Sequence, residues 1–162
     1  MNYNPKDPLS VQNYYDANEE RNTLIQKTIL AEAESGKRVL VVDFHLKHID
    51  SLVIATKTLK LEPYHYIRVK HRTKDAIAEH QKSILFANVV LCTKPHLIKR
   101  EHEFDSLLLL KPIANLLILR NLVGALKQKN VHTFDLTHKI YTFFKTVEYP
   151  VTLINHHTEG LL

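Results

Sequence analysis

The stretch Arg38-Val-Leu-Val-Val-Asp43 decides the fold of this chain of 162 residues. Its four consecutive apolar residues, three of them β-branched, do not alternate with polar residues, which is typical of a strand buried on both faces. Gly36 ends a helical pattern just before this stretch, and that pattern begins after Asn18, a residue suited to cap a helix. A helix that leads into a fully buried strand favours a parallel sheet covered by helices.

Helices and strands continue to alternate outward from this strand. Apolar residues at helical spacing predict further helices at about 49–59, 73–83, 114–127 and 138–146. Short apolar runs predict further strands at 64–69, 88–92, 106–110, 131–136 and 149–154. We therefore expect an α/β fold in three layers, with a mostly parallel central sheet and helices on both faces. Residues 1–17 hold two prolines and no sustained period, so we expect an irregular N-terminal arm there and a single domain over residues 18–162.

The composition excludes several classes of protein. The three glycines, at positions 36, 124 and 160, are too far apart to form a phosphate loop or a dinucleotide fingerprint. The single cysteine, Cys92, excludes a disulfide framework within the chain. Polar residues interrupt the most apolar segment, 107–126, too often for a membrane span. We expect a protein of a reducing compartment, cytoplasmic or nuclear, with no membrane partner and no cofactor.

Positive charge is concentrated in the middle of the chain. The whole sequence has 22 basic and 17 acidic residues, whereas residues 37–100 alone hold 13 basic and 5 acidic residues. Such an excess suggests a surface that faces a polyanion, although a solvated lysine-rich face is the common alternative.

The predicted topology gives these cations a place. Ligands of doubly wound sheets bind where loops leave the carboxyl ends of the strands. The loops after the first three predicted strands carry most of the basic side chains, so we expect these side chains to share one rim. The basic side chains that this placement brings to the rim are His45, Lys47, His48, Lys70, His71, Arg72, Lys74, Lys94, His96, Lys99 and Arg100.

Several segments between Arg21 and Thr146 resemble the second, C-terminal RecA-like domain of superfamily 2 helicases, particularly those of viruses and phages. The first is Gly36-Lys-Arg-Val-Leu-Val-Val-Asp-Phe-His45, a strand followed by a loop with histidine. The others are Val89-Val-Leu-Cys92-Thr93 and Phe104-Asp-Ser106 with the leucines that follow. The resemblance implies a RecA-like domain and a sugar-phosphate contact by three loops. The residues that it matches to these loops are His45 and Lys47; His71, Arg72 and Thr73; and Thr93 with Lys94.

The chain departs from that family at the residues used for ATP hydrolysis. The family carries Gln-x-x-Gly-Arg-x-x-Arg on a helix that closes over ATP, and the matching stretch here is Asn121 to Gln128. Ala125 and Gln128 occupy the two arginine positions, and arginine fingers supply roughly 10³ to 10⁵ in rate. These 162 residues also hold no match to the family's first RecA-like domain with its phosphate loop. The resemblance therefore predicts a degenerate domain without ATPase activity.

The candidate residues also allow interpretations other than phosphate binding. Thr73 can simply cap its helix, and the cations can be solvated. His45 and His48 lie at helical spacing, but with one cysteine in the chain no zinc-ligand pattern is complete, so we expect no metal. Asp43 and Asp135 both end predicted strands and could hold Mg²⁺ for phosphoester hydrolysis, although aspartate there is also a common turn residue.

We therefore expect a catalytically inactive helicase-like protein that binds single-stranded DNA or RNA through phosphates, or that belongs to a replication, transcription or repair assembly. One alternative is the C-terminal half of a split helicase, which would pair with a separate RecA-like ATPase domain. Another is a protein–protein adaptor that docks a larger partner and has no nucleic-acid role. Aromatic residues in the arm, Tyr3, Tyr14 and Tyr15, favour such docking.

Overall fold

The computed structural model describes residues 6, 7, 13, 16–43, 46–58, 64–66, 74–110, 115–134 and 152–156. The described helices are α2 (Glu19–Glu34), α3 (Leu46–Thr58), α4 (Lys74–Phe86) and α5 (Leu116–Gly124), with two short 3-10 helices, η1 (Pro95–Leu97) and η2 (Arg100–His102). The described strands are β1 (Val39–Val42), β2 (Tyr64–Tyr66), β3 (Val89–Cys92), β4 (Phe104–Leu109), β5 (Leu126–Thr133) and β6 (Thr152–Asn155).

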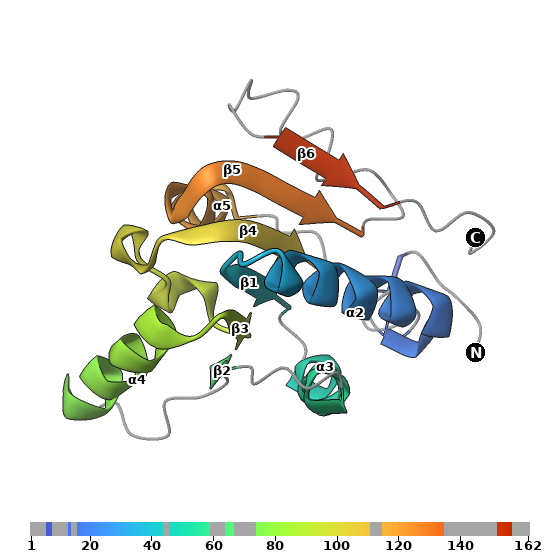
Figure 1. The fold of residues 1–162 in the computed structure, drawn as a ribbon, viewed down its shortest axis with the longest axis horizontal. Coiled ribbons are helices and arrows are strands. Elements are labelled where there is room, and N and C mark those ends of the chain that lie inside the picture. Colours follow the sequence, from blue (N-terminus) through green and yellow to red (C-terminus); the bar gives the residue numbers. More distant parts are fainter. Residues whose placement is uncertain are drawn as a thin grey trace.

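These strands form one parallel sheet in the order β2-β3-β1-β4-β5-β6 (Figure 1). β1 lies between β3 and β4, and its four residues are all buried, as its unbroken apolar run predicts. Because all six described strands are parallel, their carboxyl ends lie at one side of the sheet and their amino ends at the opposite side. Each connection between two strands must therefore return from the first side to the second. We call these sides the carboxyl end and the amino end of the sheet.

Side chains of β1 alternate between two hydrophobic cores. Leu40 and Val42 pack into a core with Ile84 of α4 and with Leu119 and Leu122 of α5. Val39 and Val41 pack into a second core on the opposite face, which contains residues of the other two helices: Ile25 and Ile29 of α2, and Ile49 and Leu52 of α3. Helices therefore cover both faces of the sheet, and the three-layer α/β fold predicted from the sequence is confirmed.

Most predicted elements match the structure with small shifts at their ends, and the boundary between α5 and β5 differs most. Asn18 caps α2, because its side chain accepts a hydrogen bond from the Arg21 amide. The helix predicted at 114–127 ends at Gly124, and β5 begins at Leu126 instead of at residue 131. The first residues of β5 pair with β4 across a register shift, although 127–130 are all polar and gave no strand signal. The helix predicted at 138–146 lies outside the described residues.

The N-terminal arm is not irregular throughout. Asn13, Asp16 and Ala17 are helical, which corrects the prediction for these residues. The backbone carbonyl of Asp16 accepts a hydrogen bond of 2.8 Å from the Asn22 side chain, so this part of the arm packs back onto α2. No described helix is long and apolar enough to cross a bilayer.

Candidate functional site at the carboxyl end of the sheet

Three neighbouring strands end together at the carboxyl end of the sheet. Cys92, the last residue of β3, is in register with Tyr66 at the end of β2 and with Val42 at the end of β1. The Asp43 amide donates a hydrogen bond of 3.1 Å to the Cys92 carbonyl, which extends this pairing beyond the strands. The carboxyl ends of β1, β2 and β3 therefore lie side by side.

Only some of the predicted nucleic-acid-binding residues share that end. Lys47 is exposed in the first turn of α3, four residues beyond Asp43. Thr93 and Lys94 are half-buried and directly follow β3. Lys74 is the exposed first residue of α4, which projects away from the sheet in Figure 1. His45, His71, Arg72 and Thr73 lie outside the described residues.

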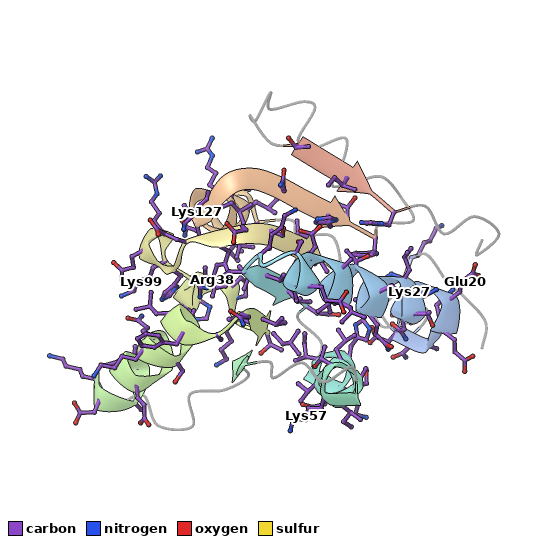
Figure 2. The ribbon with its side chains drawn as sticks, viewed as in Figure 1. Glu20, Lys27, Arg38, Lys57, Lys99 and Lys127 are labelled. Carbon is purple, nitrogen blue, oxygen red and sulfur yellow. The ribbon has the colours of Figure 1, made fainter. Side chains whose placement is uncertain are left out.

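Lys99 and Arg100 lie at the opposite, amino end of the sheet, so the prediction that they share the rim with Lys94 is wrong. β3 and β4 flank β1, so the connection between them must return from the carboxyl end before β4 starts. The Lys99 side chain donates to Gln81 of α4 at 3.2 Å, and the Arg100 side chain lies against Gly124 at the end of α5. Figure 2 labels Lys99 and Arg38, the residue that precedes β1, at this same end of the sheet.

The stretch matched to the family's arginine helix also lies at the amino end. α5 stops at Gly124, Ala125 is its C-cap, and the Ala125 carbonyl accepts a hydrogen bond from the Phe104 amide at the start of β4. Gln128 belongs to strand β5 and not to a helix. The match of Asn121–Gln128 to a helix that closes over a ligand at the carboxyl end is therefore corrected.

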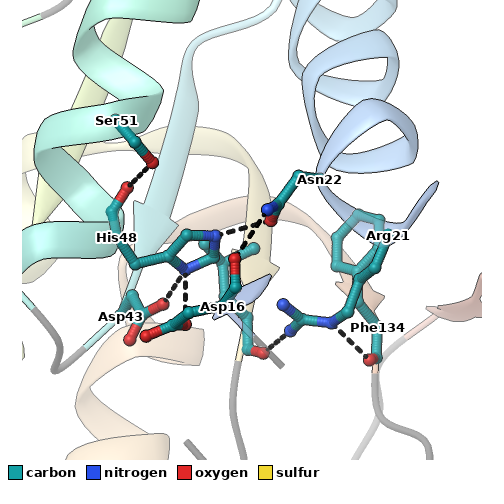
Figure 3. Close-up of polar contacts among 8 residues, drawn as sticks. Asp16, Arg21, Asn22, Asp43, His48, Ser51 and Phe134 are labelled. Atoms are coloured by element: carbon teal, nitrogen blue, oxygen red, sulfur yellow. Dashed lines mark hydrogen bonds and ion pairs between the residues drawn. The ribbon is translucent and has the colours of Figure 1, made fainter. Parts of the chain in front are cut away.

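A buried polar cluster occupies the carboxyl end of β1 (Figure 3). His48 is 3% exposed and Asp43 is fully buried. Nδ1 of His48 lies 2.5 Å from Oδ2 of Asp43 and 3.3 Å from Oδ1 of Asp16. Nε2 of His48 lies 2.8 Å from Oδ1 of Asn22 in α2. One side chain of this cluster comes from the arm, one from the residue that follows β1, one from α2 and one from α3.

Arg21 binds the carboxyl ends of two strands next to this cluster. Its side chain is fully buried, and its Nε donates to the Phe134 carbonyl at 3.2 Å while Nη2 donates to the Leu110 carbonyl. Leu110 and Phe134 directly follow β4 and β5. One guanidinium therefore satisfies backbone acceptors from two strand ends, for which its planar fork is well suited.

A second polar cluster, built around Glu32, lies between α2 and the sheet. Glu32 accepts from the buried Ser106 hydroxyl at 2.6 Å and pairs with Lys37 at 3.0 Å. Nε2 of His132 lies 3.5 Å from Glu32, and the His132 ring stacks on His156. Burial raises the pKa of Glu32, but Ser106, Lys37 and His132 outweigh it and lower that pKa overall. The serine bonds to the carboxylate and not to a histidine, so this is no nucleophile–base pair.

Cys92 is also unsuited to nucleophilic chemistry. It is fully buried, and this burial raises the pKa of its thiol to about 12. A thiol becomes a nucleophile only as the thiolate, so Cys92 is a core residue.

The sequence indicates Asp43 and His48 as candidate ligands separately, but it does not predict that they contact each other. From the sequence, Asp43 is a candidate Mg²⁺ ligand with Asp135, and His48 is a candidate metal ligand with His45. Asp135 and His45 lie outside the described residues. An aspartate that ends a buried strand, followed five residues later by a histidine in the first turn of a helix, is a local signal for the Asp43–His48 contact. Asp16 carries no such signal.

The fold is similar to that of a known helicase domain. The crystal structure of the Hef helicase domain from Pyrococcus furiosus matches 78% of this chain with a TM-score of 0.53 and 9% sequence identity. The chain spans 28% of the length of that structure. No protein-family model and no curated protein matches the sequence. The similarity shows a helicase-like, RecA-type α/β fold, as the sequence predicted.

Proposed function

We propose that this chain is a helicase-like module that binds the backbone of single-stranded nucleic acid at the carboxyl end of its sheet and does not hydrolyse nucleotides on its own. The observation that carries the proposal is the adjacency of β2, β3 and β1, whose carboxyl ends lie together at one end of the sheet. The helicase resemblance assigns backbone contact to the segments that follow these three strands.

Two of the described segments offer groups that bind phosphate. Thr93 and Lys94 supply a hydroxyl and an ammonium group directly after β3. Lys47 adds a second ammonium group, which is exposed in the first turn of α3, where helix amides and the helix dipole favour an anion. Such contacts give affinity with little dependence on base sequence.

Paired lysine substitutions test the site. Fluorescence anisotropy with labelled single strands of several sequences would compare wild type, Lys47→Ala/Lys94→Ala, and the charge-matched control Lys99→Ala/Lys127→Ala at the amino end. We expect the first pair to weaken binding equally for all sequences. The slope of log K against log salt should fall by about 0.7 for each lost phosphate contact. The control pair should change affinity much less, and equal losses from the two pairs would contradict the proposed site.

The proposed lack of hydrolysis rests on the sequence. Three separated glycines leave no phosphate loop, and without one the chain cannot hold the β- and γ-phosphates as P-loop enzymes do. A steady-state phosphate-release assay, with ATP or GTP and with or without single-stranded DNA, should give background rates. Turnover that co-elutes with the protein and persists after a second purification step would show that the chain is an enzyme.

A further inference from the structure

The Asp16–Asp43–His48 cluster has the composition and the compactness of a metal site. Each residue offers one ligand atom, and these atoms, two carboxylate oxygens and the His48 Nδ1, lie within 4.8 Å of one another. We propose that these three residues bind one divalent transition-metal ion of the zinc type. The proposal does not depend on nucleic-acid binding, because it uses none of the lysines proposed for that function.

Asn22 fixes the protonation pattern of the His48 ring. The Asn22 Nδ2 donates to the Asp16 carbonyl at 2.8 Å, so the Asn22 Oδ1 is the atom that faces Nε2 of His48, also at 2.8 Å. An amide oxygen can only accept, so Nε2 carries a proton. In the neutral ring the lone pair is then on Nδ1. A hydrogen bond to the distal ring nitrogen is the usual way in which proteins orient a metal-ligating histidine.

Nδ1 faces two carboxylates, Asp43 at 2.5 Å and Asp16 at 3.3 Å. A lone pair directed at two anionic oxygens is favourable only when a positive charge lies between them. A proton on Nδ1 serves one oxygen well, whereas a metal ion serves all three ligand atoms at once. The convergence of a second carboxylate on the same nitrogen is what favours the metal.

The distances fit a zinc ion after a small adjustment. Two ligand atoms that each lie about 2.0–2.1 Å from a tetrahedral zinc ion are about 3.3 Å apart. Nδ1 of His48 and Oδ1 of Asp16 have this separation, and Oδ2 of Asp43 would have to withdraw by roughly 0.8 Å from its 2.5 Å contact. Imidazole nitrogen favours zinc over magnesium or calcium, and three protein ligands leave a fourth position for water.

Metal titration of the full chain tests the proposal. After treatment with a chelator, the protein would be titrated with ZnCl₂ by isothermal calorimetry, and in parallel with CoCl₂ to follow the visible bands of tetrahedral Co²⁺. We expect one tight equivalent. Asp43→Asn and Asp16→Asn should each weaken it at least 10-fold, because an amide replaces a carboxylate ligand. Far-UV circular dichroism identifies variants that fold, and Asp16, which is partly exposed, is the safer substitution.

Matched controls are needed because the chain has 11 histidines. Asp50→Asn and His96→Ala change exposed residues of the same types outside the cluster, and should leave the tight equivalent intact. Zinc that binds the wild type and folded Asp16→Asn equally well, or a loss caused by His96→Ala, would overturn the proposal. The absence of any tight equivalent would also overturn it and would identify the cluster as a proton-bridged ion pair.

Discussion

At each end of the sheet one arginine side chain binds several backbone carbonyls, but the polar side chains near the two arginines differ. At the carboxyl end, Arg21 donates to the carbonyls of Leu110 and Phe134. The acceptors in these two bonds do not belong to the His48 cluster. At the amino end, Arg38 lies 4.7 Å over the Phe104 ring. Its side chain also donates to four carbonyls, those of Ile84, Ala87, His102 and Glu103. The amino end is thus closed by structural contacts, and the carboxyl end keeps the side chains suited to ligands.

The largest expected effect comes from the carboxyl end. Arg21→Met removes two hydrogen bonds from a fully buried charged donor, so we expect a loss of about 3–5 kcal/mol in the free energy of unfolding. Arg21→Lys keeps the charge but not the fork, and should fall between Met and wild type. Urea denaturation measures all three proteins. A loss below about 1 kcal/mol for Arg21→Met would mean that Arg21 does not hold this end together.

A smaller loss is expected at the amino end. Arg38→Lys keeps the charge but cannot reach all four carbonyls, which belong to the end of α4, to the residue that follows it and to the segment around η2. Arg38 is only half-buried, so water can replace some of the lost bonds, and we expect about 1–3 kcal/mol. The same denaturation experiment measures this loss. A larger loss in the free energy of unfolding for Arg38→Lys than for Arg21→Met would contradict the order of the two ends.

Acidification should lower the free energy of unfolding, because histidines at both ends of the sheet have lowered pKa values. Burial is the main cause that lowers the pKa of His102 at the amino end, and of His132 and His156 beside Glu32. Each folded pKa lies below the ordinary value of 6.5, so the unfolded chain binds more protons as the pH falls below that value. The free energy of unfolding should therefore be full above about pH 7 and decrease towards about pH 5.

Substitution can locate this pH dependence. His102 accepts a hydrogen bond of 2.9 Å from the Lys99 amide through Nδ1, and the Oδ1 of asparagine can accept it instead. His102→Asn should flatten the pH dependence of the urea midpoint, and the exposed control His96→Ala should leave its slope unchanged. A slope that His102→Asn leaves unaltered would assign the effect to the His132–His156 pair, whose rings stack 5.2 Å apart.

The sequence predicts the centre of this fold better than its margins. The run Val39–Val42 alternates between two cores, so its apolar character on every residue correctly indicated a strand with two covered faces. The polar start of β5 was missed because pairing with β4 outweighs the local pattern. The sequence places residues 93–100 on one rim, because nothing in them indicates that the chain returns to the other end of the sheet.

The candidate site was predictable only in part, for a similar reason. Thr93 and Lys94 directly follow β3, and Lys47 lies in the first turn of the helix after β1, so the pattern of strands and helices alone places them. The His48 cluster joins Asp16, Asn22 and Asp43 through tertiary contacts that span up to 32 residues of the chain. Composition and spacing do not encode such contacts, since they depend on how the arm and α2 pack on β1.

The smallest expected effect concerns Gly124, which the helicase resemblance matched to a glycine before the first arginine. Its φ is not in the left-handed region, and an added Cβ would meet the Arg100 side chain, with Nε at 3.2 Å. Arg100 is exposed and can move, while alanine restricts the unfolded chain more than glycine does. Gly124→Ala should therefore raise the free energy of unfolding by about 0–1 kcal/mol and leave nucleic-acid affinity unchanged. A loss of affinity in the folded variant would show that the amino end also contacts nucleic acid, and the division of roles between the two ends would fail.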